Sequence, residues 1–205
     1  MTVFWFRRDL RFEDNVGLFH ALNSGEEVLP IFIFDEIILS QLQKDDARVT
    51  FIHQQLEKLQ LELQKIGKSL AVFHGKPLDV YRKLISENNI TCVYTNRDYE
   101  PYARKRDLEL FHLFKERAIE FKTSKDQVIF EKNDVLKDDG TPYVVYTPYS
   151  NKWKENLKKI QLVNYNSEDF LDKIASHSYP FLSLSDIGFT TSSIKVTPYD
   201  ISTHL

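Results

Sequence analysis

Short apolar runs alternate with longer segments of helical period from the start of the chain to about residue 125. Four of these runs, at residues 2–6, 28–34, 70–73 and 90–95, have the length and the apolar character of strands in a sheet that helices cover. The more polar segment 120–123 is a candidate fifth strand. Pro30 has no backbone N–H to donate to a neighbouring strand, so it slightly weakens the second strand prediction.

Four segments between these runs predict helices, because their apolar residues recur at intervals of three and four. The four segments are residues 14–24, 52–66, 78–88 and 102–117. The second is the clearest, with one apolar stripe formed by Ile52, Leu56, Leu59, Leu63 and Ile66. Gly67 follows it where a left-handed cap is expected, and Pro77 suits a first helical position. In the last segment we expect Leu108 and Phe111 to face inward.

A strand and a helix that alternate along the chain predict right-handed crossovers and an α/β fold. We therefore expect a doubly wound, mostly parallel, five-stranded Rossmann-like sheet with helices on both faces. Such sheets bind their ligands beyond the carboxyl ends of the strands. The segments that follow the predicted strands are residues 7–14, 35–39, 74–76 and 96–106.

The sequence lacks the motifs of the common nucleotide-binding and hydrolytic folds. The turn after the first strand, Arg7 to Arg11, contains no glycine, so it has no G-x-G-x-x-G motif, and no phosphate-binding loop or G-x-S-x-G occurs elsewhere. The six histidines show no metal-binding spacing. The single cysteine, Cys92, excludes an internal disulfide and predicts a buried strand thiol.

The pattern changes beyond residue 125, where periodicity weakens and serine, threonine and aspartate become common. We expect residues 1–130 to form the α/β domain and residues 131–205 to close it and to act as a linker. Asn151 to Lys159 predicts a short basic helix around Trp153.

The composition is that of a packed globular domain, with 205 residues, 42% hydrophobic residues and 15 phenylalanines. The formal net charge of −3 argues against tight autonomous binding to DNA, which usually requires an excess of lysine and arginine. No apolar run approaches the roughly 18 residues that a membrane span requires, and no signal peptide is recognisable. We expect a soluble, cytoplasmic protein.

Four blocks of sequence, in order along the chain, resemble the DNA photolyase/cryptochrome family. The first, FWFRRDLRFEDNVGL at 4–18, resembles the opening signature W-F-R-x-D-L-R-x-x-D-N-x-x-L. The others are IFIFD at 31–35, DYEPYARKRD at 98–107, and GTPYVVYTPY at 140–149, the last followed by Trp153. The resemblance covers roughly residues 1–155, and its first and last blocks are specific.

The resemblance implies an N-terminal α/β domain that carries a light-harvesting antenna chromophore. In such proteins a linker leads to a helical domain that binds FAD, contacts damaged DNA and repairs pyrimidine dimers with light. Nothing in this sequence resembles that helical domain, so we expect FAD and damaged DNA to be bound only by a longer parent protein. The chain alone is not expected to be catalytic.

The resemblance also implies which residues bind the antenna chromophore. Arg48, Asp98 and Glu100 resemble positions that hold a flavin or a deazaflavin, so FMN or 8-hydroxy-deazaflavin is expected. Folate-binding members tend to have Asn-Glu where this chain has Tyr102-Ala103, which disfavours folate. Phe34 and Asp35 after the second strand, and Arg7, Arg8 and Asp9 after the first, complete the expected site. For the last three, a salt-bridge network that shapes the turn is an equal alternative.

Other side chains have simpler interpretations. The basic run Arg104-Lys105-Arg106 is typical of a solvated helix face. Trp5 and Trp153 are expected to be core or interface aromatics, since the electron-transfer tryptophans of the family belong to the helical domain.

Two alternatives to a photolyase antenna domain remain. One is the corresponding domain of a cryptochrome-type photoreceptor, in which the domain is mainly structural. The other is a stand-alone nucleotide-binding α/β domain, which the absence of a glycine-rich loop disfavours.

Overall fold

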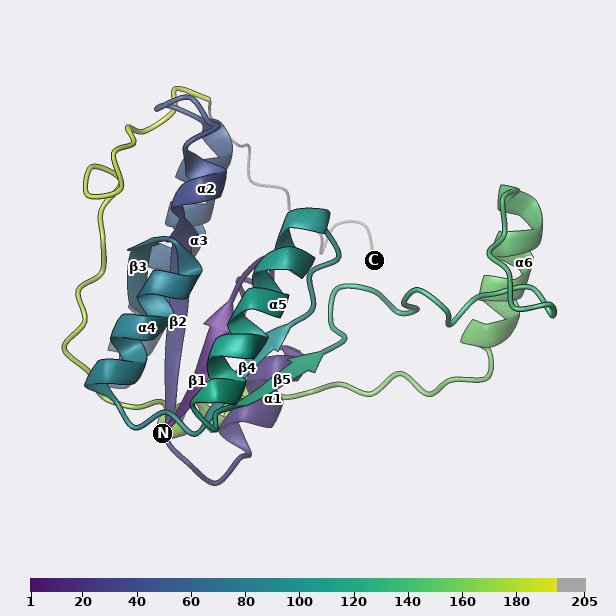
Figure 1. The fold of residues 1–205 in the computed structure, drawn as a ribbon, viewed down its shortest axis with the longest axis horizontal. Coiled ribbons are helices and arrows are strands. Elements are labelled where there is room, and N and C mark those ends of the chain that lie inside the picture. Colours follow the sequence, from purple (N-terminus) through teal and green to yellow (C-terminus); the bar gives the residue numbers. More distant parts are fainter. Residues whose placement is uncertain (195–205) are drawn as a thin grey trace.

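Five parallel strands form one sheet in the order β3-β2-β1-β4-β5 (Figure 1). The computed structural model describes residues 1–194. The strands are β1 (Thr2–Phe6), β2 (Val28–Asp35), β3 (Ala71–Gly75), β4 (Cys92–Asn96) and β5 (Glu120–Ser124). Each of the four strand pairs is parallel. The predicted doubly wound α/β fold is therefore confirmed, with β1 at the centre of the sheet.

The helices are α1 (Val16–Leu22), α2 (Glu36–Leu39), α3 (Ala47–Gln64), α4 (Pro77–Glu87), α5 (Pro101–Glu116), α6 (Tyr146–Leu157) and the 3₁₀ segment η1 (Ser167–Lys173). The five predicted helices are present, α6 beginning five residues earlier than expected, while α2 and η1 were not predicted. The side chain of Asn15 caps α1 by accepting a hydrogen bond from the Leu18 amide. Asp46 caps α3 in the same way, so α3 begins one turn before its apolar stripe.

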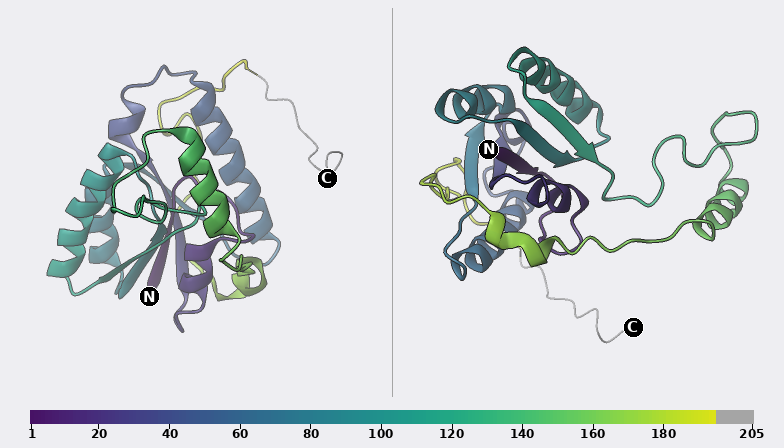
Figure 2. Two further views of the ribbon diagram at one scale, coloured as in Figure 1. Left: turned by 90° about the vertical axis from the view of Figure 1, so that its right-hand side faces the viewer. Right: turned by 90° about the horizontal axis from the view of Figure 1, so that it is seen from below.

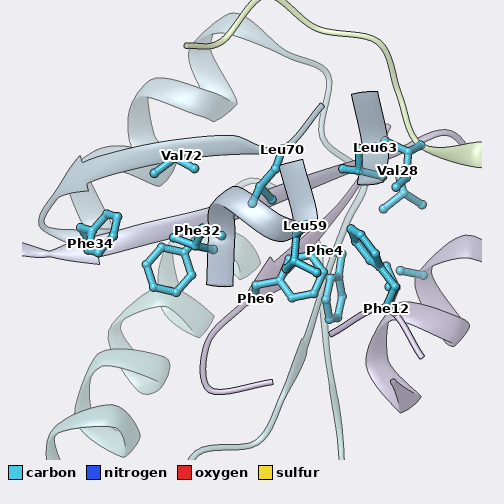
Figure 3. Close-up of a cluster of buried hydrophobic side chains, with 14 of the residues drawn as sticks. Phe4, Phe6, Phe12, Val28, Phe32, Phe34, Leu59, Leu63, Leu70 and Val72 are labelled. Carbon is cyan, nitrogen blue, oxygen red and sulfur yellow. The ribbon is translucent and has the colours of Figure 1, made fainter. Parts of the chain in front are cut away.

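Each face of the sheet has its own hydrophobic core, because successive side chains of a strand point to opposite faces. Phe4 and Phe6 of β1 pack beneath α1 and α3, and Figure 3 shows Leu59 of α3 lying beside both rings. Val3 and Trp5 of the same strand pack on the other face with residues of α4 and α5. In Figure 1, α4 and α5 lie in front of the sheet.

One helix shows a different inward face from the one predicted. Leu108 and Phe111 of α5 are exposed, so the prediction that they face inward is wrong. The buried residues of α5 are Ala103, Arg106, Leu110, Leu113 and Phe114. The burial of Arg106 also contradicts the prediction that the basic run is solvated. Because Arg106 is charged, the apolar pattern did not identify the face of α5 that is buried. Ile66, which follows α3, is likewise exposed rather than core.

Beyond β5 the chain leaves the sheet, carries α6 as an outlying helix and returns (Figure 2). No residue of α6 is buried, and Trp153 packs edge-on against Phe130 of the same excursion. After the return, η1 packs on α1, and Ile187 and Phe189 enter the core of the domain. The division at residue 130 stays a prediction, and residues 195–205 of the predicted linker lie outside the described residues.

Candidate functional site

A cavity of about 470 Å³ opens at the carboxyl edge of the sheet, where β1 and β2 end. Its volume lies within the range of about 300–1,000 Å³ that is usual for small-molecule sites. Most of the apolar lining comes from the strand ends and from α2 and α3, and it includes Phe6, Phe32, Phe34, Leu39, Val49 and Ile52. These side chains form the apolar surface against which the ring system of a ligand can pack.

Two arginines line the outer part of the cavity, and each is paired with carboxylates. Arg48 is 72% exposed and its guanidinium lies 2.7 Å from Asp46. Hydrogen bonds from Arg48 lower the pKa of Asp46 to about 2. Arg8 lies 3.3 Å from Asp98 and 3.6 Å from Glu100. Both arginines therefore present donors at the entrance while carboxylate acceptors remain beside them.

A second pair of arginines lies deeper, around the ring of Trp5. Arg7 donates two hydrogen bonds of 2.8 Å to Asp107, and its Cζ atom lies 4.1 Å from the centroid of Trp5. Arg106 has its Cζ atom 4.7 Å from the same centroid. Burial lowers the pKa of Arg7, while the nearby Asp107 carboxylate acts in the opposite direction.

Asp35 holds a fixed position in the wall of the cavity. One carboxylate oxygen caps α2 by accepting a hydrogen bond of 3.0 Å from the Ile37 amide. The other accepts a hydrogen bond of 2.7 Å from the Tyr102 hydroxyl and lies 3.7 Å from Arg106. Burial, followed by this bond to Asp35, raises the pKa of Tyr102. The carboxylate, carried by β2, is therefore oriented by two further elements, α2 and α5.

Asp9 lies in a buried polar network below the cavity. It accepts a hydrogen bond of 2.8 Å from the Arg7 amide and others from the side-chain amides of Asn15 and Asn96. Burial raises the pKa of this carboxyl group. Asn96 in turn accepts a hydrogen bond from the Gly17 amide at 2.9 Å. The network thus ties the turn after β1 to the end of β4 and the start of α1.

The cavity brings together six of the eight side chains expected in the site. Those six are Arg7, Arg8, Phe34, Asp35, Arg48 and Asp98. Glu100 adjoins the cavity through Arg8, and Asp9 belongs to the buried network instead. The direct contact of any of the eight with a ligand stays a prediction.

Sequence reasoning missed Trp5 and Arg106, which also line the cavity. A signal for Trp5 existed, because it lies near the carboxyl end of β1, two residues before the predicted turn begins at Arg7. No comparable signal existed for Arg106, which stands within a run of three basic residues.

Metal-binding clusters and membrane-spanning helices are both absent from residues 1–194. No group of three or more histidine, cysteine, aspartate or glutamate side chains with metal-binding geometry occurs there. None of the helices in that part of the chain is both long enough and apolar enough to cross a membrane.

Comparisons with known proteins agree with one another. The family model described as DNA photolyase matches residues 2–167. A deoxyribodipyrimidine photo-lyase of Synechococcus sp. is 33% identical over 156 residues, which are 76% of this chain and 32% of that protein. The chain thus spans about a third of the length of this relative. Proteins named cryptochromes are similar as well.

Two solved photolyase structures resemble the fold. The crystal structure of a bacterial class III photolyase from Agrobacterium tumefaciens has a TM-score of 0.77 at 25% identity, covering 94% of this chain and 39% of that one. An archaeal photolyase from Sulfolobus tokodaii has a TM-score of 0.64 at 26% identity, covering 85% and 42%. The latter is described as holding two FAD molecules, with the implication of a novel light-harvesting cofactor.

Proposed function

The chain belongs to the DNA photolyase/cryptochrome family, and on that premise we propose that its cavity binds a light-harvesting chromophore. The chain is a photolyase-type N-terminal α/β domain. The observation that carries the proposal is the cavity of about 470 Å³ at the carboxyl edge of the sheet, with apolar walls and paired arginines. A planar ring system suits such a lining, because its faces are apolar and its edge is polar.

FMN or 8-hydroxy-deazaflavin fits this lining better than a folate does. Guanidinium groups such as that of Arg48 can pair with ring oxygens or stack on the ring. Carboxylates such as that of Asp98 can accept hydrogen bonds from ring N–H groups or from the hydroxyls of a ribityl chain. Tyr102 stands where folate-binding members tend to have asparagine, and its hydroxyl bonds to Asp35.

The parent protein in this proposal is a deoxyribodipyrimidine photolyase. Residues 131–205 would close the α/β domain and lead as a linker to a helical domain, to which the repair of damaged DNA and the binding of FAD would belong. The net charge of −3 supports a domain that does not itself hold DNA tightly.

A cryptochrome-type photoreceptor is the second candidate parent, supported by similar proteins that bear the name cryptochrome. In that case the domain is mainly structural, and the cavity has no need of a chromophore. A stand-alone nucleotide-binding domain is disfavoured by the turn from Arg7 to Arg11, which lacks glycine. Titration with ATP tests that alternative directly.

The test is a titration of the purified chain with FMN, a deazaflavin and a reduced folate, followed by absorption and fluorescence. Ile38 lines the cavity and is 45% exposed, so Ile38→Glu adds a carboxylate at the mouth without disturbing the core. Ile66 is 48% exposed and lies outside the lining, so Ile66→Glu is the matched control. Arg48→Ala is compared with Arg82→Ala, since Arg82 is also an exposed arginine paired with a nearby aspartate.

We expect saturable binding of FMN or the deazaflavin that Ile38→Glu and Arg48→Ala weaken and that both controls leave unchanged. Equal weakening by variant and control, or no binding of any chromophore, contradicts an antenna role. Absence of binding by any chromophore favours the cryptochrome-type alternative, in which the domain is mainly structural.

A further inference from the structure

Trp5 has two positively charged side chains over its indole ring. The Cζ atoms of Arg7 and Arg106 lie 4.1 Å and 4.7 Å from the ring centroid. All three residues line the cavity in which we place the chromophore. The chromophore would therefore share its cavity with an indole that is in contact with two cations.

An indole beside an excited flavin normally quenches it. Tryptophan is among the side chains that lose an electron most readily, and an excited isoalloxazine ring accepts one. The products are an indole radical cation and a flavin radical anion. Return of the electron restores both ground states without light emission or energy transfer. A tryptophan in a light-harvesting cavity therefore opposes the function of that cavity.

The two guanidinium groups make this electron transfer unfavourable at Trp5. A radical cation on the indole would stand beside two existing positive charges, in surroundings where water screens little of the repulsion. Carboxylates offset part of these charges: Asp107 is bound to Arg7 by two hydrogen bonds of 2.8 Å, and Asp35 lies 3.7 Å from Arg106. The guanidinium groups nevertheless lie over the ring themselves, so their field acts on it at the shortest range.

Ion pairing explains only part of the position of Arg106. This residue is only 8% exposed, yet its hydrogen bonds to Asp107 are long, at 3.4 Å. The same oxygen of Asp107 already accepts a hydrogen bond of 2.8 Å from Arg7. Asp35, the other carboxylate near Arg106, lies 3.7 Å away. Ion pairs as long as these offset only part of the cost of burying a guanidinium. Its place over Trp5 therefore calls for another role.

We propose that Arg106, together with Arg7, prevents Trp5 from reducing the excited chromophore, so that the excitation remains available for transfer. This inference rests on the proposed function, because it requires a chromophore in the cavity. Arg106 acts through Trp5, by making the oxidation of its indole less favourable.

Time-resolved fluorescence of FMN bound to the full chain tests the proposal, with the protein in excess so that free FMN does not contribute. The variants are Arg106→Met, Arg106→Lys, Trp5→Phe and the double variant Trp5→Phe/Arg106→Met. Arg106→Met removes the cation while keeping a long side chain, and Arg106→Lys keeps the charge. Saturation binding and circular dichroism of each variant establish that the fold and the cavity are retained.

We expect Arg106→Met to shorten the lifetime of bound FMN several-fold, and Arg106→Lys to leave it near the wild-type value. Trp5→Phe alone should change the lifetime little, because Trp5 is already prevented from quenching. The double variant should recover the long lifetime, since it lacks the electron donor. Such recovery distinguishes electron transfer from a general loosening of the cavity.

A wild-type lifetime in Arg106→Met, or a short lifetime that persists in the double variant, overturns the inference. If variants of Trp5 do not fold, the comparison of Arg106→Met with Arg106→Lys decides it alone. Absence of binding by FMN and by the deazaflavin in the wild-type chain overturns the proposed function and this inference together. If FMN binds and its lifetime is the same in the wild type and in Arg106→Met, only the inference is overturned and the proposed function stands.

Discussion

The hydroxyl of Tyr102 donates a hydrogen bond of 2.7 Å to Asp35, and this bond joins the first turn of α5 to the end of β2. These two elements belong to distant parts of the chain, and the cavity lies at the edge of the sheet where they meet. Asp35 also caps α2, whose residues supply part of the apolar lining. The pair therefore links the position of α5 to the shape of the proposed chromophore site.

Replacement of Tyr102 by phenylalanine should destabilise the protein by about 1 kcal/mol, the usual net value of one hydrogen bond. It should also weaken FMN binding, because the Asp35 carboxylate loses one of the groups that orient it. Urea unfolding and FMN titration measure the two effects. Tyr146→Phe is the control, since Tyr146 is exposed on α6, and it should change neither quantity. Unchanged FMN affinity in Tyr102→Phe would show that this bond does not shape the site.

The pair formed by Arg7 and Asp107 should be among the costliest to break. Asp107→Asn leaves the buried Arg7 guanidinium without its counter-charge, and such losses cost about 3–5 kcal/mol. The exposed pair of Arg82 and Asp79 offers the comparison, where Asp79→Asn should cost at most about 1 kcal/mol. Urea unfolding of both variants at neutral pH measures the difference. Similar costs would mean that water reaches Arg7 more freely than its burial indicates.

Gly17 should not tolerate a side chain, although its backbone conformation allows one. An added Cβ atom would lie 2.5 Å from Oδ1 of Asn96 and 3.0 Å from the ring of Phe4. Gly17→Ala should therefore destabilise the domain by about 1–3 kcal/mol, despite the better helix propensity of alanine. Gln54→Ala, an exposed change in α3, should be close to neutral. The thermal unfolding midpoints measure both, and a neutral Gly17→Ala would show that Asn96 can move aside.

The strands were predictable because a parallel sheet covered on both faces imposes continuous apolar runs. The run at 2–6, for example, became β1 without any change of bounds. The segment 120–123 is more polar and became the partly exposed β5, one residue longer than predicted. Helix α3 was predictable for a similar reason, and only its first turn was missed. That turn depends on the cap from Asp46, which adds no apolar residue to the stripe.

The inner part of the candidate site was not predictable in the same way. Arg106 stands between Lys105 and Asp107 in the sequence, and nothing local distinguishes it from a solvated residue. Its burial follows from Trp5, a residue about a hundred positions earlier, whose ring faces α5. Arg48 and Asp98 were expected in the site through family resemblance, and the structure places both on the lining of one cavity.

The returning segment after η1 is held to the domain by a histidine. His177 Nε2 lies 2.9 Å from the carbonyl oxygen of Ser69, to which it donates in the neutral form. Nδ1 of the same ring accepts a hydrogen bond of 3.2 Å from the Tyr179 amide. The two contacts form together only while the ring is neutral, because a protonated ring can still donate from Nε2 but can no longer accept at Nδ1.

Acid should therefore weaken the protein through His177. Burial lowers the pKa of this histidine below its ordinary value of 6.5, so the unfolded chain binds the proton more readily than the folded one. Its contribution to the free energy of unfolding is complete above pH 6.5 and is lost as the pH falls through the lower, folded pKa. His177→Gln should show a smaller loss of stability than the wild type between neutral and mildly acidic pH, measured by urea unfolding. His112→Gln, an exposed change in α5, should keep the wild-type pH dependence. If His177→Gln and the wild type lose stability in parallel, other groups cause the acid response. His177 then contributes hydrogen bonds whose strength does not change over this pH range.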